Sequence, residues 1–224
     1  GGLLYLVIIV MGLFGEMFVR GKLVVSGDAA ATADNIAAHP FLWRLGIAGD
    51  LVMHICDIGL VLVFYLLLRP VNKNLALLAV LFNVVQTAVL VTNKLSLLTP
   101  LFLSGNAEYL RAFDPAQLQA MGYLAIKSHG YGFGFGLIFF GIECLILGYL
   151  IFRSGYLPRM LGILMQVAGL CYLVNSFALI LDPPFADMLF PAILLPAFVA
   201  ELSMCVWMIV KGVDMGKWEM HVAG

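Results

Sequence analysis

Six long apolar segments, separated by shorter polar stretches, dominate the pattern of hydrophobic and polar positions along the chain. Each segment has about the 20 residues that a helix needs to cross roughly 30 Å of hydrocarbon. The segments lie near residues 2–19, 46–68, 75–97, 128–152, 159–181 and 189–211. The pattern predicts an all-α fold, a bundle of six transmembrane helices with both chain termini on the same side of the membrane.

Polar residues in the first and third connections predict short helices outside the membrane. Asp28 is a good N-cap for the alanine-rich run that follows it, and this helix should end before His39. Asp114 as N-cap and Pro115 as the first helical residue predict a second short helix, which reaches about Ala125.

Two further motifs predict how the chain enters and leaves its spans. Asp182 and the two prolines after it predict a tight, extended turn between the fifth and sixth segments. Phe41, Trp43 and Arg44 precede the second segment. They predict an interfacial anchor, because aromatic and basic side chains favour the level of the lipid headgroups.

Positive charge is concentrated in the connections on one side of the predicted bundle. Residues 69–73 and 153–159 carry two cations each and no acid, and Lys211 and Lys217 follow the sixth segment. By the positive-inside rule these stretches face the cytoplasm. We therefore expect both termini to be cytoplasmic.

Composition agrees with a membrane protein. The chain is 63% apolar and only 11% charged, and its mean hydropathy is +1.05, as is typical of a polytopic protein. We expect residues 1–224 to form a single integral membrane domain whose partner is membrane lipid. A net charge of -1 and the lack of any basic run argue against nucleic acid as a partner.

Cysteine and glycine spacings indicate packing rather than chemistry. The four cysteines lie in four different apolar segments without a C-x-x-C pair, which argues against a disulfide framework or a zinc site. Every second residue from Gly130 to Gly136 is a glycine. The resulting G-x-x-x-G spacings permit close helix approach.

The second apolar segment contains two carboxylates and an imidazole. Asp50, His54 and Asp57 fall within a narrow arc of one helical face at about 100° per residue, so they can point together into a bundle interior. A charge at the bilayer centre costs at least ~2.5 kcal/mol, and ionisable residues in such segments are functional candidates.

Polar residues in other segments extend this face into a predicted cavity. The candidate cavity residues are Glu16, Asp50, His54, Asp57, Asn83, Lys94, His129, Asn175 and Glu201. Further polar residues in or near the segments are Gln86, Asn93, Glu143 and Gln166. Counting about 1.5 Å per residue puts Asp57 and Glu201 near the midplane and most of the others toward the outer leaflet. We expect a polar, outward-opening cavity centred on Asp57, His54 and Glu201.

Two of the open interpretations need a cofactor. A divalent metal would use His54, His129, Asp57 and Glu201, which are suitable ligand types, although no H-E-x-x-H or E-x-x-H spacing supports it. A haem would use His54 and His129 as axial ligands from two different segments. The metal is favoured over the haem.

Two other interpretations need no cofactor. Asp57, Glu143, Glu201 and Lys94 would form a proton- or ion-coupled path, as in transporters, although internal repeat symmetry is weak. Otherwise the polar groups only pair with one another and hold the helices together.

Five stretches carry a resemblance to a known family. They are Gly2-Leu-Leu-Tyr-Leu with residues 16–20, the run from Gly27 to Ile36, Leu68-Arg-Pro-Val-Asn-Lys73, the run from Tyr149 to Arg159, and the run from Leu195 to Ser203. In these the chain resembles a bacterial membrane family catalogued as a domain of unknown function, number 4386. The resemblance implies a multi-pass protein of the bacterial inner (plasma) membrane and supplies no catalytic residues.

The functional expectation is a small-ligand or metal site inside the membrane, with Asp57, His54 and Glu201 as the candidate catalytic residues. Its ligand would be lipid-soluble or come from the outer leaflet, and whether it is an enzyme stays open. The alternatives are a non-catalytic accessory subunit of a larger membrane complex and a proton- or ion-coupled transporter. The expected protein partner is a second copy of the chain, in a homo-oligomer, or a larger membrane complex.

Overall fold

The computed structural model describes residues 1–105 and 107–223, in which all regular structure is helical and no strand occurs. Six helices are long and apolar enough to cross a membrane, namely Gly2–Leu23, Pro40–Leu68, Lys73–Leu103, Pro115–Ser154, Arg159–Leu181 and Ala192–Val210. The prediction of an all-α, six-span bundle is confirmed, and the fold is that of a multi-pass membrane protein.

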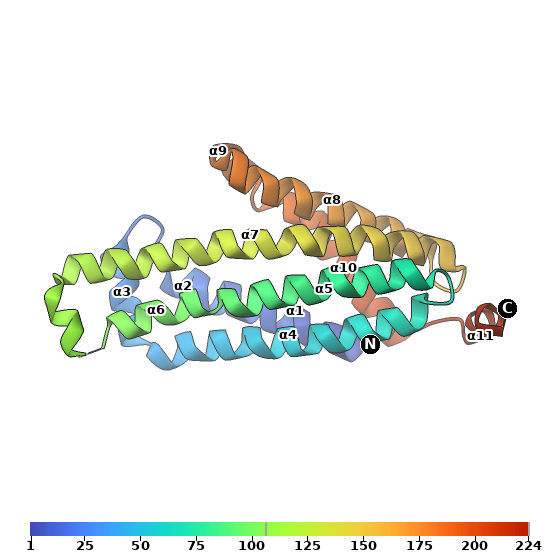
Figure 1. The fold of residues 1–224 in the computed structure, drawn as a ribbon, viewed down its shortest axis with the longest axis horizontal. Helices are drawn as coiled ribbons and strands as arrows, with labels where there is room; N and C mark the ends of the chain where they lie inside the picture. Colours follow the sequence, from blue (N-terminus) through green and yellow to red (C-terminus); the bar gives the residue numbers. More distant parts are fainter. Residues whose placement is uncertain (106, 224) are drawn as a thin grey trace.

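Several spans are built from more than one helical piece. The first half of the chain contains α1 (Gly2–Leu13), the π-helical η1 (Phe14–Arg20), α2 (Gly21–Leu23), α3 (Ala29–Ala38), α4 (Pro40–Leu68), α5 (Lys73–Asn93) and α6 (Leu95–Leu103). The second half contains η2 (Glu108–Ala112), α7 (Pro115–Ser154), α8 (Arg159–Leu181), α9 (Pro183–Leu189), η3 (Ala192–Leu194), α10 (Leu195–Val210) and α11 (Met215–Ala223). Helices α4, α5 and α7 run along the long axis of the molecule (Figure 1).

The two ends of the bundle differ. One end, here called the α3 end, carries α3 and the connection from α6 to α7, whereas the other, the α11 end, carries α11 (Figure 1). The start of the chain packs against the last turn of α10, because a side chain added at Gly2 would come within 2.6 Å of Ile209 Cγ1. Both termini therefore lie toward the α11 end, as an even number of spans requires.

Helices α7 and α8 approach each other at backbone distance. A Cβ atom on Gly162 would lie 2.6 Å from the carbonyl oxygen of Gly148, and one on Gly169 would lie 2.6 Å from that of Gly141. In lipid, helices associate through such close packing because burial from water supplies no force between them. Any larger residue at these glycines would separate the two helices.

The N-cap predictions are confirmed, but one predicted helix end is wrong. Asp28 accepts a hydrogen bond from the Ala31 N–H and starts α3. Asp114 starts α7 with a reciprocal capping box to Gln117. The helix then continues without interruption for 40 residues instead of ending near Ala125, since no proline follows Pro115 until Pro158.

Two further expectations are corrected. Asp182 and its prolines form no extended turn, because Asp182 accepts a hydrogen bond from the Phe185 N–H and caps α9, whose first positions suit proline. Trp43 is no interfacial anchor: its ring is buried, and its Nε1 donates a 2.6 Å hydrogen bond to the Leu97 carbonyl. A tryptophan with a partner for its N–H packs well inside a protein.

The α11 end is closed by hydrogen bonds to the end of α4. The Tyr156 hydroxyl and the Trp218 Nε1 both donate to the Leu67 carbonyl oxygen, at 2.5 and 3.2 Å. Burial raises the pKa of Tyr156 to about 12, so its hydroxyl keeps its proton at neutral pH. The C-terminal helix is thereby fixed to the bundle.

Candidate functional site

A set of paired charges lies inside the bundle toward the α3 end. This charged cluster consists of Glu16, Arg20, Asp50 and Lys94. Asp50 Oδ2 lies 2.8 Å from Arg20 Nη1 and 2.8 Å from Lys94 Nζ, and Arg20 Nε lies 2.8 Å from Glu16 Oε2. The side chain of Asp50 is only 1% exposed. Two acids therefore face two cations, and the cluster is balanced in charge.

Two irregular stretches position the charged cluster. The π-helical turns of η1 bring Glu16 and Arg20 to the surface of α4, and Lys94 occupies the junction between α5 and α6. Gly15 makes room, because a Cβ atom there would lie 2.5 Å from Asp50 Oδ1 and 3.0 Å from Arg20 Nη2. π-Helical segments occur frequently at functional sites.

Two histidines adjoin the charged cluster. His129 Nε2 lies 3.3 Å from Lys94 Nζ, and the His129 carbonyl accepts a 2.8 Å hydrogen bond from Asn93 Nδ2. His54, one turn after Asp50 on α4, is within electrostatic reach of Asp50 and Lys94. Its Nε2 is buried without a hydrogen-bond partner in the part of the chain that the structure describes.

A second polar group, farther along α4 and α5, contains acids without cations. This carboxyl cluster consists of Asp57, Asn83, Thr87 and Glu143. Asn83 Nδ2 lies 3.2 Å from Asp57 Oδ2 and 3.1 Å from Glu143 Oε2, so one amide nitrogen bridges two carboxyl groups. The Thr87 hydroxyl adds a 3.1 Å hydrogen bond to Asp57 Oδ2. Gln86 Oε1 also lies 3.4 Å from the bridging nitrogen.

Two observations leave the carboxyl cluster incomplete. Within the described residues no lysine, arginine or histidine nitrogen lies within 4.0 Å of Asp57 or Glu143. Asn83 is fully buried, and its Oδ1 has no hydrogen-bond partner among those residues. Buried polar groups are nearly always paired, and each exception needs an explanation.

Glu201 belongs to a neighbouring contact. It accepts a hydrogen bond from the Tyr172 hydroxyl, which joins α8 to α10. Glu201 is within electrostatic reach of Asp57 and Glu143. Asn175 and Gln166 are half-buried on α8 and form no hydrogen bond with either cluster within the described chain.

The structure thus divides the residues of the predicted cavity. It brings Glu16, Asp50, Lys94, His129 and His54 to one group, and Asp57 with Asn83 to another. Lys94 pairs with Asp50 and not with the midplane acids, because the junction after α5 lies level with Asp50. Asp57, His54 and Glu201 thus belong to three different sets of contacts in the described residues, and a cavity shared by them stays a prediction.

The cofactor interpretations gain no support from this arrangement. Across residues 1–105 and 107–223, no three His, Cys, Asp or Glu side chains gather in a way that could hold a metal ion. His54, His129, Asp57 and Glu201 are thus not one ligand set. For a haem, Lys94 Nζ occupies the space in front of His129 Nε2 that an axial iron would need.

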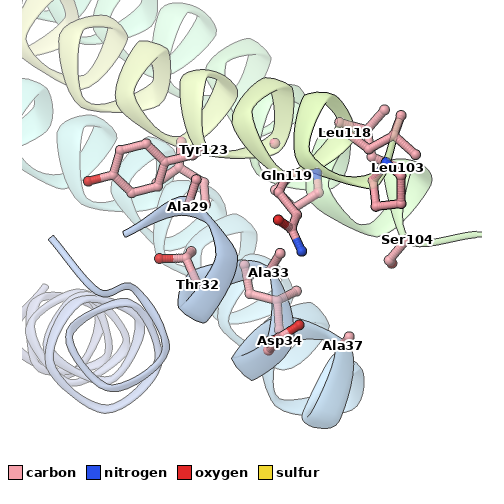
Figure 2. Close-up of a pocket in the computed structure, with 15 residues that line it drawn as sticks. Ala29, Thr32, Ala33, Asp34, Ala37, Leu103, Ser104, Leu118, Gln119 and Tyr123 are labelled. Atoms are coloured by element: carbon pink, nitrogen blue, oxygen red, sulfur yellow. The ribbon is translucent and has the colours of Figure 1, made fainter. Parts of the chain in front are cut away.

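A separate cavity lies at the α3 end, between α3, α6 and α7 (Figure 2). Its volume is ≈ 210 Å³. Small residues of α3, such as Ala33, and Gly122 of α7 leave this space open, while Gln119 and Asp34 supply polar groups at its edge. Tyr123 closes one side and accepts a 2.6 Å hydrogen bond from the Gly27 N–H.

Sequence reasoning missed this cavity and several residues of the clusters. Arg20 and Thr87 were not among the candidates, although Arg20 follows Glu16 at the i, i+4 spacing that favours an ion pair on a helix. The run of small residues at the start of α3 is a sequence signal of the cavity, but its meaning becomes clear only when α3 is placed against α7.

The fold and the buried polar groups together define a multi-pass helical membrane protein. Residues 1–212 match the family model described as "Domain of unknown function (DUF4386)", and the chain belongs to that family. An uncharacterized protein of Archaeoglobus fulgidus is 30% identical over 166 residues, which are 74% of this chain and 83% of that protein. This relative is archaeal, so the bacterial origin stays an expectation. No solved structure matches the chain.

Proposed function

We propose that this protein reversibly binds a small cation inside the membrane, at the carboxyl cluster, and that the cation is a proton. Such a site is the basis of cation-coupled membrane proteins, the transporters among them. The observation that supports the proposal is that one amide nitrogen, Asn83 Nδ2, holds both Asp57 and Glu143 without a cation in the described residues. Two bare carboxylates so close together require a positive charge or a proton.

The physical need for a ligand is greatest at this cluster. A carboxylate in a low-dielectric interior costs several kcal/mol of free energy unless it is paired. Helix packing alone would be served by amides or hydroxyls, and it does not need two acids on facing helices. The unpartnered Asn83 Oδ1 can accept a hydrogen bond from a protonated acid, or contact a cation, beside these carboxyl groups.

The proposed site can be tested by infrared titration of the purified protein in lipid vesicles. A carboxylic-acid band should appear as the pH is lowered and should shrink in Asp57→Asn and in Glu143→Gln. Asp214→Asn, at an exposed acid near α11, is the matched control and should leave the band unchanged. If no carboxyl group inside the wild-type protein titrates between pH 4 and 9, the proposal is wrong.

The same titration separates a proton from a monovalent metal ion. It would be repeated with sodium or potassium chloride in place of a large organic cation at equal ionic strength. A proton site gives the same curve in all three salts. Displacement of the curve by one of the two metal ions would overturn the proton assignment and identify a competing ion.

We also propose that the protein lies in the plasma membrane with the α11 end in the cytoplasm. The support is the positive charge of the connections at residues 69–73 and 153–159. Single cysteines placed in these connections should react with a membrane-impermeant maleimide only after the cells are opened. Labelling in intact cells would reverse the orientation.

The cavity at the α3 end favours a second candidate function, the binding of a small lipid-soluble molecule. Its apolar wall and polar edge fit such a ligand, although ≈ 210 Å³ is smaller than the usual drug-sized site. Ala33→Phe would fill the cavity, and mass spectrometry of the purified proteins would compare the bound small molecules. Equal amounts in the wild type and in the variant would argue against this candidate.

A further inference from the structure

We propose that His54 transfers protons between the charged cluster and the carboxyl cluster, an inference that rests on the proposed proton site. The polar groups of α4 follow one another along the bundle, with Asp50 first, His54 next and Asp57 last. At about 1.5 Å per residue, His54 lies about 6 Å from the level of Asp50 and about 4.5 Å from that of Asp57. These are rises along the helix axis, and the side chains together with a bridging water can span them.

The facing helix confirms this order. Lys94 of α5's C-terminal junction pairs with Asp50, and Thr87 of α5 bonds Asp57. The step from one cluster to the other is seven residues on each helix, from Asp50 to Asp57 on α4 and from Lys94 back to Thr87 on α5. The two antiparallel helices therefore stay in the same register over this distance. His54 is on the inner face of α4 between these two levels, and its side chain is 2% exposed.

The ring of His54 is free to act. Its Nε2 is buried and has no partner in the described part of the chain, whereas most buried polar atoms are paired. Imidazole has two ring nitrogens, so it can accept a proton on one and donate a proton from the other. For packing alone, we would expect either a histidine with both ring nitrogens hydrogen-bonded or an apolar residue at this position.

The charged cluster connects His54 to the surface at the α3 end. Glu16 is 68% exposed, and Arg20 links it to the buried Asp50. Asp50 and Asp57 precede and follow His54 on its own helix. Arg20 of η1 and Lys94 of the α5 junction contact Asp50, and His129 of α7 contacts Lys94. A chain of ionic contacts thus runs from solvent to the neighbours of His54.

The transfer itself needs no other reactant. His54 Nε2 takes up a proton that enters from the α3 end, which gives an imidazolium. The imidazolium then gives a proton to the Asp57 carboxylate, which becomes a carboxylic acid, and the ring returns to its neutral form. For the reverse direction the same steps run backward.

The test is a rapid pH jump on the protein in vesicles, followed by time-resolved infrared detection of the carboxylic-acid band. In His54→Gln, which keeps polar atoms but carries no proton, the band should reach the wild-type amplitude at a rate at least ~10-fold lower, since a positioned proton donor contributes ~10²-fold or more. His39→Gln, at an exposed histidine, should keep the wild-type rate.

The outcomes separate the two proposals. If the wild type shows no titrating band, the proton site itself is wrong. If the band titrates but His54→Gln keeps the wild-type rate, only the transfer by His54 is wrong. If His54→Gln does not fold, His54→Ala with added imidazole replaces it. The rate should then rise with imidazole concentration, and a rate independent of imidazole would overturn the transfer.

Discussion

The charged cluster and the carboxyl cluster both involve α4 and α5, and their positions on these helices are seven residues apart. The surroundings of their acids nevertheless differ in charge. Around Asp50 the chain supplies two cations within 2.8 Å. Around Asp57 it supplies an amide and a hydroxyl, at 3.2 and 3.1 Å. The protein supplies cations that neutralise the first acid, whereas within the described residues it supplies none for the second. Partner charge, more than depth or burial, therefore separates a structural acid from a candidate site.

The largest effect should come from Asp50→Asn. Arg20 and Lys94 would lose their shared carboxylate inside the bundle, and removing one partner of a buried ion pair costs about 3–5 kcal/mol. Chemical denaturation in detergent would measure the loss. Asp57→Asn is the matched variant and should change the free energy of unfolding by less than about 1 kcal/mol, because no cation depends on that carboxyl group. Equal losses would erase the contrast between the clusters.

A smaller loss is expected for Lys94→Met. Asp50 would keep Arg20 as a partner, so we expect a cost of about 2–3 kcal/mol, at or just below the lower limit for a broken buried pair. The double variant with Asp50→Asn should lose less than the sum of the two single changes. If the losses of the two single variants add up to that of the double variant, the 2.8 Å contact between Asp50 and Lys94 contributes no coupling energy.

The next smaller loss of stability is expected for Gly15→Ala. The added methyl group would lie 2.5 Å from Asp50 Oδ1 and must move the carboxylate or η1, for a cost of about 1–2 kcal/mol. Gly130→Ala is the control, because nothing lies within 4 Å of a Cβ atom there. Alanine favours a helix over glycine, so this control should be neutral or stabilising. Thermal unfolding of both variants checks the order.

The smallest effect concerns the exposed ion pair at the α11 end. Hydrogen bonds from the Lys217 backbone and side chain hold the pKa of Asp214 below its ordinary value. The contribution of this cap is therefore present above the pKa of the unfolded chain and is lost as the pH falls through the folded pKa. Fluorescence of the tryptophans, Trp218 among them, should report release of α11 in acid. Asp214→Asn should remove this pH dependence, and an unchanged acid transition would contradict the assignment.

The spans and the helix starts could be predicted from the sequence because they depend on local rules. Hydrocarbon thickness sets the length of an apolar segment, and a cap such as Asp28 or Asp114 acts within one turn. The alternating glycines were also informative, since Gly136 packs against Leu90 of α5. These features need no knowledge of which helices become neighbours.

The contacts between polar side chains of different helices could not be predicted in the same way. That Lys94 meets Asp50, and Asn83 meets both Asp57 and Glu143, depends on the register between helices. Trp43 has an interfacial sequence context, but α6 offers it the Leu97 carbonyl and a buried position. A sequence lists the polar groups of a bundle, and only the packing divides them into sites.

The length of α7 sets where each region stands relative to the lipid. Its 40 residues rise about 60 Å, twice the thickness of the hydrocarbon. Measured from the α11 end of this helix, Glu143 comes at about 17 Å and His129 at about 38 Å. With that end at one membrane face, Glu143 lies near mid-bilayer, whereas the first turns of α7, and with them the cavity beside α3, lie beyond the acyl chains. That cavity would then be open to the lipid headgroups or to water rather than to the acyl chains.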